Sequence, residues 1–329
     1  MDTVHLGLLG GGSWGNQFAD ALQTLPDIRL VAVADPDIRR AAAIADRFPA
    51  CQALAEAQAL CQMSDIDAVL VVTPTPTHYD LTCMALQAGK DVLVEKPFAL
   101  TLPQALEMIK LAEYHDRRLM VGQNMRWMPA VQEMRQRIQN GDIGKPLHVV
   151  ERRFGAFRSA AWPDWWIAMR GFLLLHLGAH SVDAILWSLN RQPQWAFAQG
   201  FARRVDPTHG AIDAFSLTLG LEGEILVGIH HEVFGKKSGL VYHLSIIGET
   251  GTMELDDFTT LRLDGETIFH QQELPFPPSL KAELIEFVTA IQENRSPIVS
   301  GRDVLPTVSS LDAARRSLDN GQKEVIIHG

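Results

Sequence analysis

The stretch VHLGLLGGGSWG, residues 4–15, decides the fold of this chain. A short apolar run, 4–9, leads into a turn with the spacing Gly-x-Gly-x-x-Gly, and from Ser13 and Trp14 onward the apolar spacing becomes helical. The three glycines of the pattern are Gly10, Gly12 and Gly15. They let the backbone approach a pyrophosphate, and the start of a helix favours that anion. The stretch therefore predicts a dinucleotide-binding strand–turn–helix.

An acidic residue follows at the expected distance. A second β run, 29–34, ends at Asp35, which would accept hydrogen bonds from the adenosine ribose and repel a 2′-phosphate. Arg39 and Arg40 come shortly afterwards and could instead hold that phosphate. The sequence thus predicts NAD as cofactor, with NADP as the alternative.

The strand–helix rhythm continues through β runs at 67–72, 91–95 and 118–121, which indicates an α/β fold with a doubly wound parallel sheet. Ligands bind at the carboxyl ends of such strands. Lys96 stands at one of these ends and is the first candidate for chemistry. Thr73, Pro74 and His78 lie in a loop at the same edge, where His78 either contacts the cofactor or begins the next helix.

Composition limits the remaining possibilities. The 329 residues suffice for two domains, and a formal net charge of −10 argues against nucleic acid or an anionic membrane as partner. Three cysteines fit no metal or disulfide spacing, and no basic-then-apolar signal segment opens the chain. The most apolar window, 172–187, contains two histidines and an aspartate and is expected to be too short to span a membrane. We expect a cytoplasmic protein.

The motif Glu95-Lys96-Pro97, together with the glycine turn, Asp35, 124–129 and 141–146, resembles the Gfo/Idh/MocA oxidoreductases, which include glucose–fructose oxidoreductase and inositol 2-dehydrogenase. The resemblance covers essentially the whole chain. It implies a Rossmann domain over residues 1–123. It also implies an α+β domain over 124–329, with a large, open, mostly antiparallel sheet through which homodimers or homotetramers form.

The resemblance also implies residue roles. Lys96 would contact the reacting hydroxyl or carbonyl, Pro97 would follow a cis peptide, and Arg126 would lie near the nicotinamide. The residues predicted to contact the cofactor are Gly10, Gly12, Ser13, Trp14, Gly15, Asp35, Arg40, Thr73, Pro74, His78, Glu95, Lys96 and Arg126.

A helix expected over about 172–189 carries His176, His180, Asp183 and Trp187 on one narrow stripe. Relatives usually have an Asp where this chain has His176. Without that negative charge we expect lower pKa values for Lys96 and His180, and a neutral His180 suits a base. Three interpretations stay open: a modified catalytic stripe, a metal site on the two histidines, and buried histidines without chemistry.

Trp165 and Trp166 precede this helix; they either bind the apolar face of a sugar, or pack in a subunit interface or cover the core. The sequence as a whole predicts an NAD(P)-dependent oxidoreductase that transfers a hydride between nicotinamide and a sugar, cyclitol or sugar-derived polyol. Lys96 would polarise the reacting oxygen, His180 would act as acid and base, and His176 would orient the substrate or relay the proton. The alternatives are a redox-neutral NAD-dependent glycosidase-type enzyme and a dinucleotide-sensing regulatory protein.

Overall fold

The computed structural model describes residues 3–155, 171–201, 212–233 and 240–328. The chain forms two compact units. The first consists of residues 1–124 and 276–305, and the second of residues 125–275 and 306–329. Residues 276–305 return to the first unit because their helix packs on the helix that follows the glycine turn. The chain therefore passes from one unit to the other not only near residue 123, where the boundary is expected, but also after residues 275 and 305.

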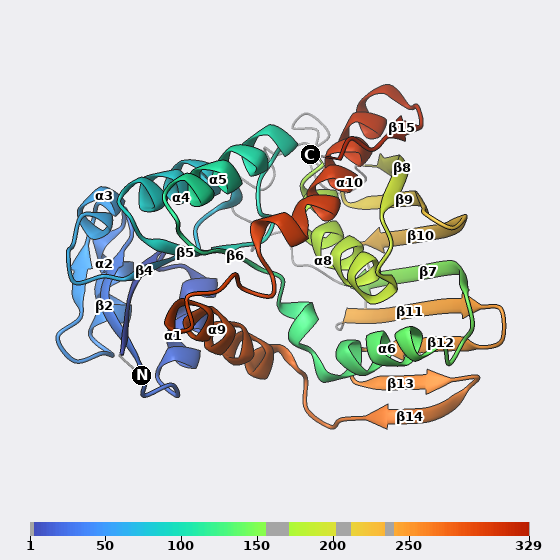
Figure 1. The fold of residues 1–329 in the computed structure, drawn as a ribbon, viewed down its shortest axis with the longest axis horizontal. Coiled ribbons are helices and arrows are strands. Elements are labelled where there is room, and N and C mark those ends of the chain that lie inside the picture. The colour runs from blue at the N-terminus through green and yellow to red at the C-terminus, as the bar shows by residue number, and fades with distance from the viewer. Residues whose placement is uncertain (1–2, 156–170, 202–211, 234–239, 329) are drawn as a thin grey trace. The chain divides into compact units, whose positions relative to one another are not determined.

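A six-stranded parallel sheet with strand order β3-β2-β1-β4-β5-β6 forms the centre of the first unit. Its strands are β1 (Val4–Leu9), β2 (Ile28–Ala34), β3 (Gln52–Leu54), β4 (Ala68–Val71), β5 (Asp91–Glu95) and β6 (Leu119–Gly122). Its helices are α1 (Ser13–Leu22), α2 (Ile38–Ala45), α3 (Ala57–Cys61), α4 (His78–Gln87), α5 (Leu102–Tyr114) and α9 (Phe276–Gln292), with a short 3-10 turn at Thr75–Thr77. α4 and α5 lie on one side of the sheet, and α1 and α9 on the other (Figure 1).

The order of the strands explains where a ligand can bind. Every residue of β4 and β5 is buried, as expected of central parallel strands covered on both faces. The strand order reverses between β1 and β4, and ligands bind at the carboxyl ends of strands beside such a reversal. The glycine turn follows β1, Thr73 follows β4 and Lys96 follows β5, so all three lie at this edge. The predicted doubly wound domain is confirmed.

The second unit is built on a nine-stranded sheet with order β14-β13-β12-β11-β7-β10-β9-β8-β15. Its strands are β7 (Pro146–Gly155), β8 (Pro193–Phe201), β9 (Ala214–Leu221), β10 (Ile225–Glu232), β11 (Leu240–Gly248), β12 (Thr252–Asp256), β13 (Thr260–Leu263), β14 (Glu266–His270) and β15 (Glu324–Val325). The pairing of β10 with β7 is parallel, and the other pairings between its described strands are antiparallel. This confirms the mostly antiparallel sheet.

Two helices of the second unit, α6 (Pro129–Asn140) and α8 (Phe172–Leu189), pack against each other and against the sheet. A 3-10 turn, Asn124–Trp127, precedes α6. α10 (Gly301–Asn320) begins in the first unit and continues in the second, with Pro306 inside it.

The apolar helix α8 corrects one expectation. The sequence predicts that the apolar window 172–187 is too short to span a membrane. The helix itself has 18 residues and is long and apolar enough to cross one by length and composition. Burial distinguishes it from a membrane span: 83% of the window lies inside the protein, as in the core helix of a globular unit.

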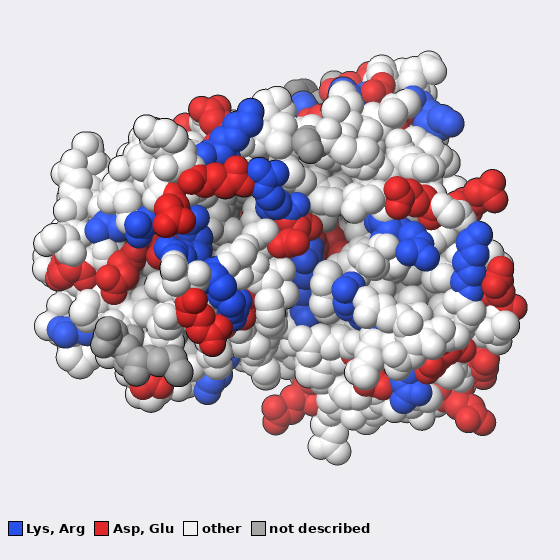
Figure 2. Space-filling view, viewed as in Figure 1, with Lys and Arg blue, Asp and Glu red and all other residues white. Residues whose placement is uncertain are grey.

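On the face drawn in Figure 2, acidic and basic side chains lie beside one another.

Candidate active site

The glycine turn has the geometry of an anion cradle. Gly10 has a positive φ of 106°, and a Cβ there would stand 2.4 Å from the Val72 carbonyl oxygen. A Cβ on Gly15 would stand 2.0 Å from the Gly10 carbonyl oxygen, so neither position accepts a side chain. Gly12 is the N-cap of α1 and supplies no side-chain cap, which leaves the first N–H groups of the helix for an anion. These residues fit the pyrophosphate of a dinucleotide.

Asp35 is held beside this turn by two backbone hydrogen bonds. Its Oδ2 accepts from the Gly11 N–H at 2.8 Å and its Oδ1 accepts from the Asp37 N–H at 2.9 Å. Each oxygen keeps a lone pair for a ribose hydroxyl. The side chain of Arg40 is exposed and lies 3.8 Å from Asp37, close to the turn. The fixed carboxylate fits NAD.

Lys96 lies directly beyond β5 and is 8% exposed. The Lys96–Pro97 peptide is cis, as the resemblance implies. The Lys96 backbone N–H donates to Glu95 Oε2 at 3.0 Å. Burial raises the pKa of Glu95 to about 7, although the Lys96 charge and the Trp14 indole oppose the shift.

His78 links two loops at the same edge. It begins α4 and is buried, with Nδ1 2.8 Å from the Pro97 carbonyl oxygen and Nε2 2.9 Å from that of Thr73. Burial lowers the pKa of His78, and the nearby Lys96 charge lowers it further. The structure thus shows His78 as the start of a helix that ties the Thr73 loop to the Lys96 loop. A contact with the cofactor stays a prediction.

The predicted stripe on α8 has a clear structural counterpart. Of the 18 residues of this helix, only His176, His180 and Trp187 are partly exposed, and the others are buried. The His176 ring stacks on Phe172 with centroids 5.0 Å apart. The two histidines therefore lie on the accessible side of an otherwise buried helix.

Asp183 departs from this stripe and pairs with Arg126. The Arg126 Nε donates to Asp183 Oδ2 and its Nη2 to Oδ1, both at 2.7 Å, and the pair is buried. Thr307 Oγ1 also donates to Asp183 Oδ1, at 3.1 Å. A bidentate arginine–carboxylate pair fixes both partners, so Arg126 anchors α8. Its predicted contact with the cofactor stays a prediction.

Two buried glutamates, Glu151 and Glu283, are not predicted from the sequence pattern. Glu283 lies on α9 among Leu280, Leu284 and Phe287, and a carboxylate on that apolar face is the signal that could have revealed it. Glu151 lies on the buried face of β7, where alternation places it with Val149. Both side chains are fully buried.

Trp165 and Trp166 lie outside the described residues, so their two interpretations stay open. Within the part of the chain that the structure describes, no group of three or more His, Cys, Asp or Glu side chains could hold a metal ion.

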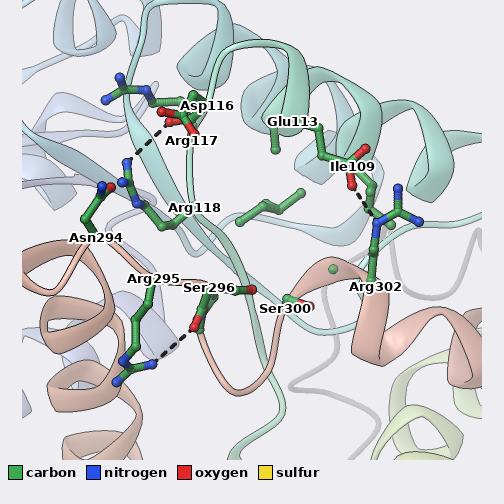
Figure 3. Close-up of a pocket in the computed structure, with 14 residues that line it drawn as sticks. Ile109, Glu113, Asp116, Arg117, Arg118, Asn294, Arg295, Ser296, Ser300 and Arg302 are labelled. Atoms are coloured by element: carbon green, nitrogen blue, oxygen red, sulfur yellow. Dashed lines mark hydrogen bonds and ion pairs between the residues drawn. The ribbon is translucent and has the colours of Figure 1, made fainter.

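A cavity of about 400 Å³ lies elsewhere in the first unit (Figure 3). It is lined by the end of α5, the turn before β6, residues 294–297 and the start of α10, including Arg117, Arg118 and Arg302. Arg118 pairs with Asp91 at the start of β5, so this cavity opens at the amino ends of the strands. The predicted cofactor residues lie at the opposite edge, and none of them lines it.

Comparisons with known proteins agree with the fold. A family profile described as "Oxidoreductase family, NAD-binding Rossmann fold" matches residues 4–123, and the "GFO/IDH/MocA C-terminal domain" profile matches residues 131–254. The chain is similar to an inositol 2-dehydrogenase of Acidothermus cellulolyticus, with 27% identity over 96% of this chain and 93% of the relative. It is also similar to a D-apiose dehydrogenase of Paraburkholderia graminis, with 24% identity over 96% and 88%.

A solved structure, that of a putative myo-inositol dehydrogenase from Sinorhizobium meliloti 1021, superposes with a TM-score of 0.85. The two chains are 26% identical, and the match covers 99% of this chain and 100% of that one. The likeness extends through both units.

Proposed function

The chain belongs to the Gfo/Idh/MocA oxidoreductases and is an NAD-dependent dehydrogenase acting on CH–OH groups, and from this premise we propose that its substrate is a cyclitol, a sugar or a sugar-derived polyol. The observation that carries the proposal is the carboxyl edge of the six-stranded sheet. The uncapped glycine turn, the fixed Asp35 and the buried Lys96 all lie at that edge. The named activities of the similar dehydrogenases support the substrate class.

We assign the proton chemistry to Lys96 and His180. NAD, held by the glycine turn and Asp35, would supply the hydride acceptor for oxidation and the hydride donor for reduction. Lys96 donates a hydrogen bond to the reacting oxygen and stabilises the charge that develops there. His180 takes the hydroxyl proton as the carbonyl forms, and gives it back in the reverse direction. His176 orients the substrate or relays this proton.

A binding screen tests the substrate class. NAD or NADP, each combined with cyclitols, aldoses and sugar acids, is added to the protein, and the melting temperature Tm is measured. A ligand that binds only the native state raises Tm. We expect NAD with a polyol to give the largest rise and to produce NADH absorbance. A larger rise with NADP, or the absence of turnover across the panel, would contradict the proposal.

Substitution tests the two residue roles. We expect Lys96→Ala and His180→Ala each to lower kcat by about 10²-fold or more, the usual contribution of a donor to the reacting oxygen and of a positioned proton-transfer group, respectively. A double variant that loses no more than either single variant would place both groups in one step. Unchanged turnover in Lys96→Ala would refute its assignment.

His176 motivates a second candidate. A retained NAD could serve a redox-neutral cleavage of glycosidic bonds, and an imidazole where relatives carry a carboxylate is a changed site of the kind such a step could use. Release of nitrophenol from nitrophenyl glycosides without net NADH formation would favour this candidate over the simple dehydrogenase.

We also propose that the chain forms a homodimer or homotetramer through the nine-stranded sheet. The support comes from exposed apolar side chains on two of its strands, β10 and β11: Leu226, Val241 and Ile247. By strand alternation they lie on the face opposite the buried one, and an open apolar sheet face suits an interface. Leu226→Asp should shift the mass measured by light scattering toward the monomer.

A further inference from the structure

Glu283 is a buried acid whose carboxylate finds no hydrogen-bond partner in the described part of the chain. It stands on α9 with 0% exposure, and both its carboxylate oxygens are buried without a hydrogen bond from any described residue. Moving a bare carboxylate into such a site is costly, and a proton relieves the cost. A glutamic acid on this face would be neutral and could donate a hydrogen bond, which a carboxylate cannot.

A second buried acid acts on Glu283. Burial and, after it, the negative charge of Glu95 hold the pKa of Glu283 well above its usual value. Glu95 is 4% exposed, and its Oε1 is buried without a hydrogen-bond partner among the described residues. Two interacting buried carboxyl groups do not both ionise near neutral pH.

The other charged groups nearby are already engaged. On α9, Glu286 pairs with Arg295, and on α1, which packs on α9, Asp20 pairs with Arg47. At the end of β5, the Lys96 charge acts on Glu95.

From the start of α1, the Trp14 indole N–H lies close enough to Glu95 to lower its pKa without making a hydrogen bond of good geometry. On α4, His78 interacts with the Lys96 charge. The charge of the carboxyl pair is therefore set by Glu95, Glu283 and Lys96.

We propose that Glu283 is a positioning residue: it keeps a proton that it shares with Glu95, so that above neutral pH the pair carries one negative charge beside Lys96. Glu95 Oε2 already holds the Lys96 backbone N–H, and the shared proton holds Oε1. The pair thereby fixes the loop that presents the lysine. This inference rests on the proposed role of Lys96, but the shared proton itself does not.

The first test needs no substrate. Infrared difference spectroscopy of the full-length protein at about pH 8 should show the C=O stretch of a protonated carboxyl group. This pH is well above the ordinary pKa of Glu, so an ordinary glutamate would give no such band. The band should vanish in Glu283→Gln and persist in the control Glu286→Gln, which makes the same change on the same helix. A wild-type spectrum without the band would overturn the proposal.

Thermal stability gives an independent readout. The folded protein holds the Glu283 proton more tightly than the unfolded chain, so the wild type loses stability as pH rises above the unfolded pKa. Glutamine does not titrate. The Tm of Glu283→Gln relative to wild type should therefore rise from about pH 5 to about pH 9.

The control behaves differently. Burial would raise the pKa of Glu286, but hydrogen bonds from Arg295 and the Ile298 N–H hold it below its usual value. The Tm deficit of Glu286→Gln should therefore stay level over the same range. An equally level difference for Glu283→Gln would contradict the shared proton.

Kinetics test the positioning role. Glu283→Leu removes the donor to Glu95, so the acid limb of kcat/KM should move upward by about one pH unit, a loss of about tenfold below it. Glu283→Gln keeps a neutral donor and should restore that limb. A merely structural residue would lower Tm without moving the pH profile, and that outcome would refute the role.

The outcomes separate the two proposals. If Lys96→Ala keeps full turnover while the carboxyl band is present, the role of Lys96 fails and the shared proton stands. If Lys96→Ala is inactive and the band is absent, the proposed function stands and the inference fails.

Discussion

Two fully buried glutamates, one in each unit, show how differently a protein can treat the same side chain. Glu151 on β7 accepts from His231 Nε2 at 2.7 Å and from Ser181 Oγ at 2.9 Å, with Arg153 Nε at 3.9 Å. Glu283 on α9 accepts from no described residue. Their burial is equal, so the groups around them decide their charge: hydrogen-bonding partners at Glu151, and the charge of Glu95 at Glu283.

The pKa shifts follow from this difference. Burial alone would raise the pKa of Glu151, but His231, Arg153 and Ser181 together hold it below the usual value. Burial lowers the pKa of His231, whose Nδ1 is buried without a hydrogen bond among the described residues. A neutral ring that donates from Nε2 satisfies both observations. Glu151 is thus an ionised structural anchor, whereas Glu283 holds a proton.

The anchor also bears on the candidate active site. Ser181, which donates to Glu151, directly follows His180 on α8, and Asp183, which binds Arg126, lies three residues beyond it. Two buried polar contacts therefore set the rotation of the helix that presents His180. Buried hydrogen bonds of this kind favour a single arrangement.

The largest expected effect comes from breaking the anchored glutamate. Glu151→Leu leaves Arg153 and His231 buried without their carboxylate, and should lower the free energy of unfolding by about 3–5 kcal/mol. Denaturant unfolding measures this cost. Glu283→Leu is the matched variant, and since it removes a neutral acid whose one proposed contact is the proton shared with Glu95, its cost should be clearly smaller. Equal costs would mean that the two sites do not differ as described.

Asp183→Asn should have the next largest effect. The amide keeps the shape but removes the negative charge and one acceptor from buried Arg126, which should cost about 1–3 kcal/mol. Because Asp183 anchors the helix of His180, kcat should fall as well. Full activity at full stability would show that Arg126 does not need this partner.

A pH series on Glu151→Gln sharpens the contrast with Glu283. The depressed pKa of Glu151 contributes stability that is present above the unfolded pKa and is lost as pH falls through the folded pKa. The stability deficit of the variant should therefore shrink in acid, by at most about 1.4 kcal/mol per pH unit. A stability deficit that grows in acid instead would mean that folding does not lower the pKa of Glu151.

The contrast also marks what sequence patterns reveal. The glycine turn, Asp35 and Lys96 follow from local spacing, because each stands where a strand ends and topology brings those ends together. The α8 stripe follows from helical period, and the exposure of His176 and His180 agrees with it. The pairing of Asp183 with Arg126 does not follow from the sequence, since the two residues are 57 positions apart and only folding brings them together.

The smallest expected effect belongs to an exposed acid near the cavity at the amino edge of the first sheet. Glu113 pairs with Arg302, and the arginine lowers the pKa of that carboxyl despite a small opposing effect of burial. Both side chains remain in water, where screening and side-chain entropy cancel most of the attraction. Arg302→Ala should therefore leave Tm unchanged within error at all salt concentrations. A clear fall in Tm at low salt would show that an exposed ion pair can stabilise this fold as the buried contacts of Glu151 do. Burial would then no longer explain why the partners of Glu151 matter.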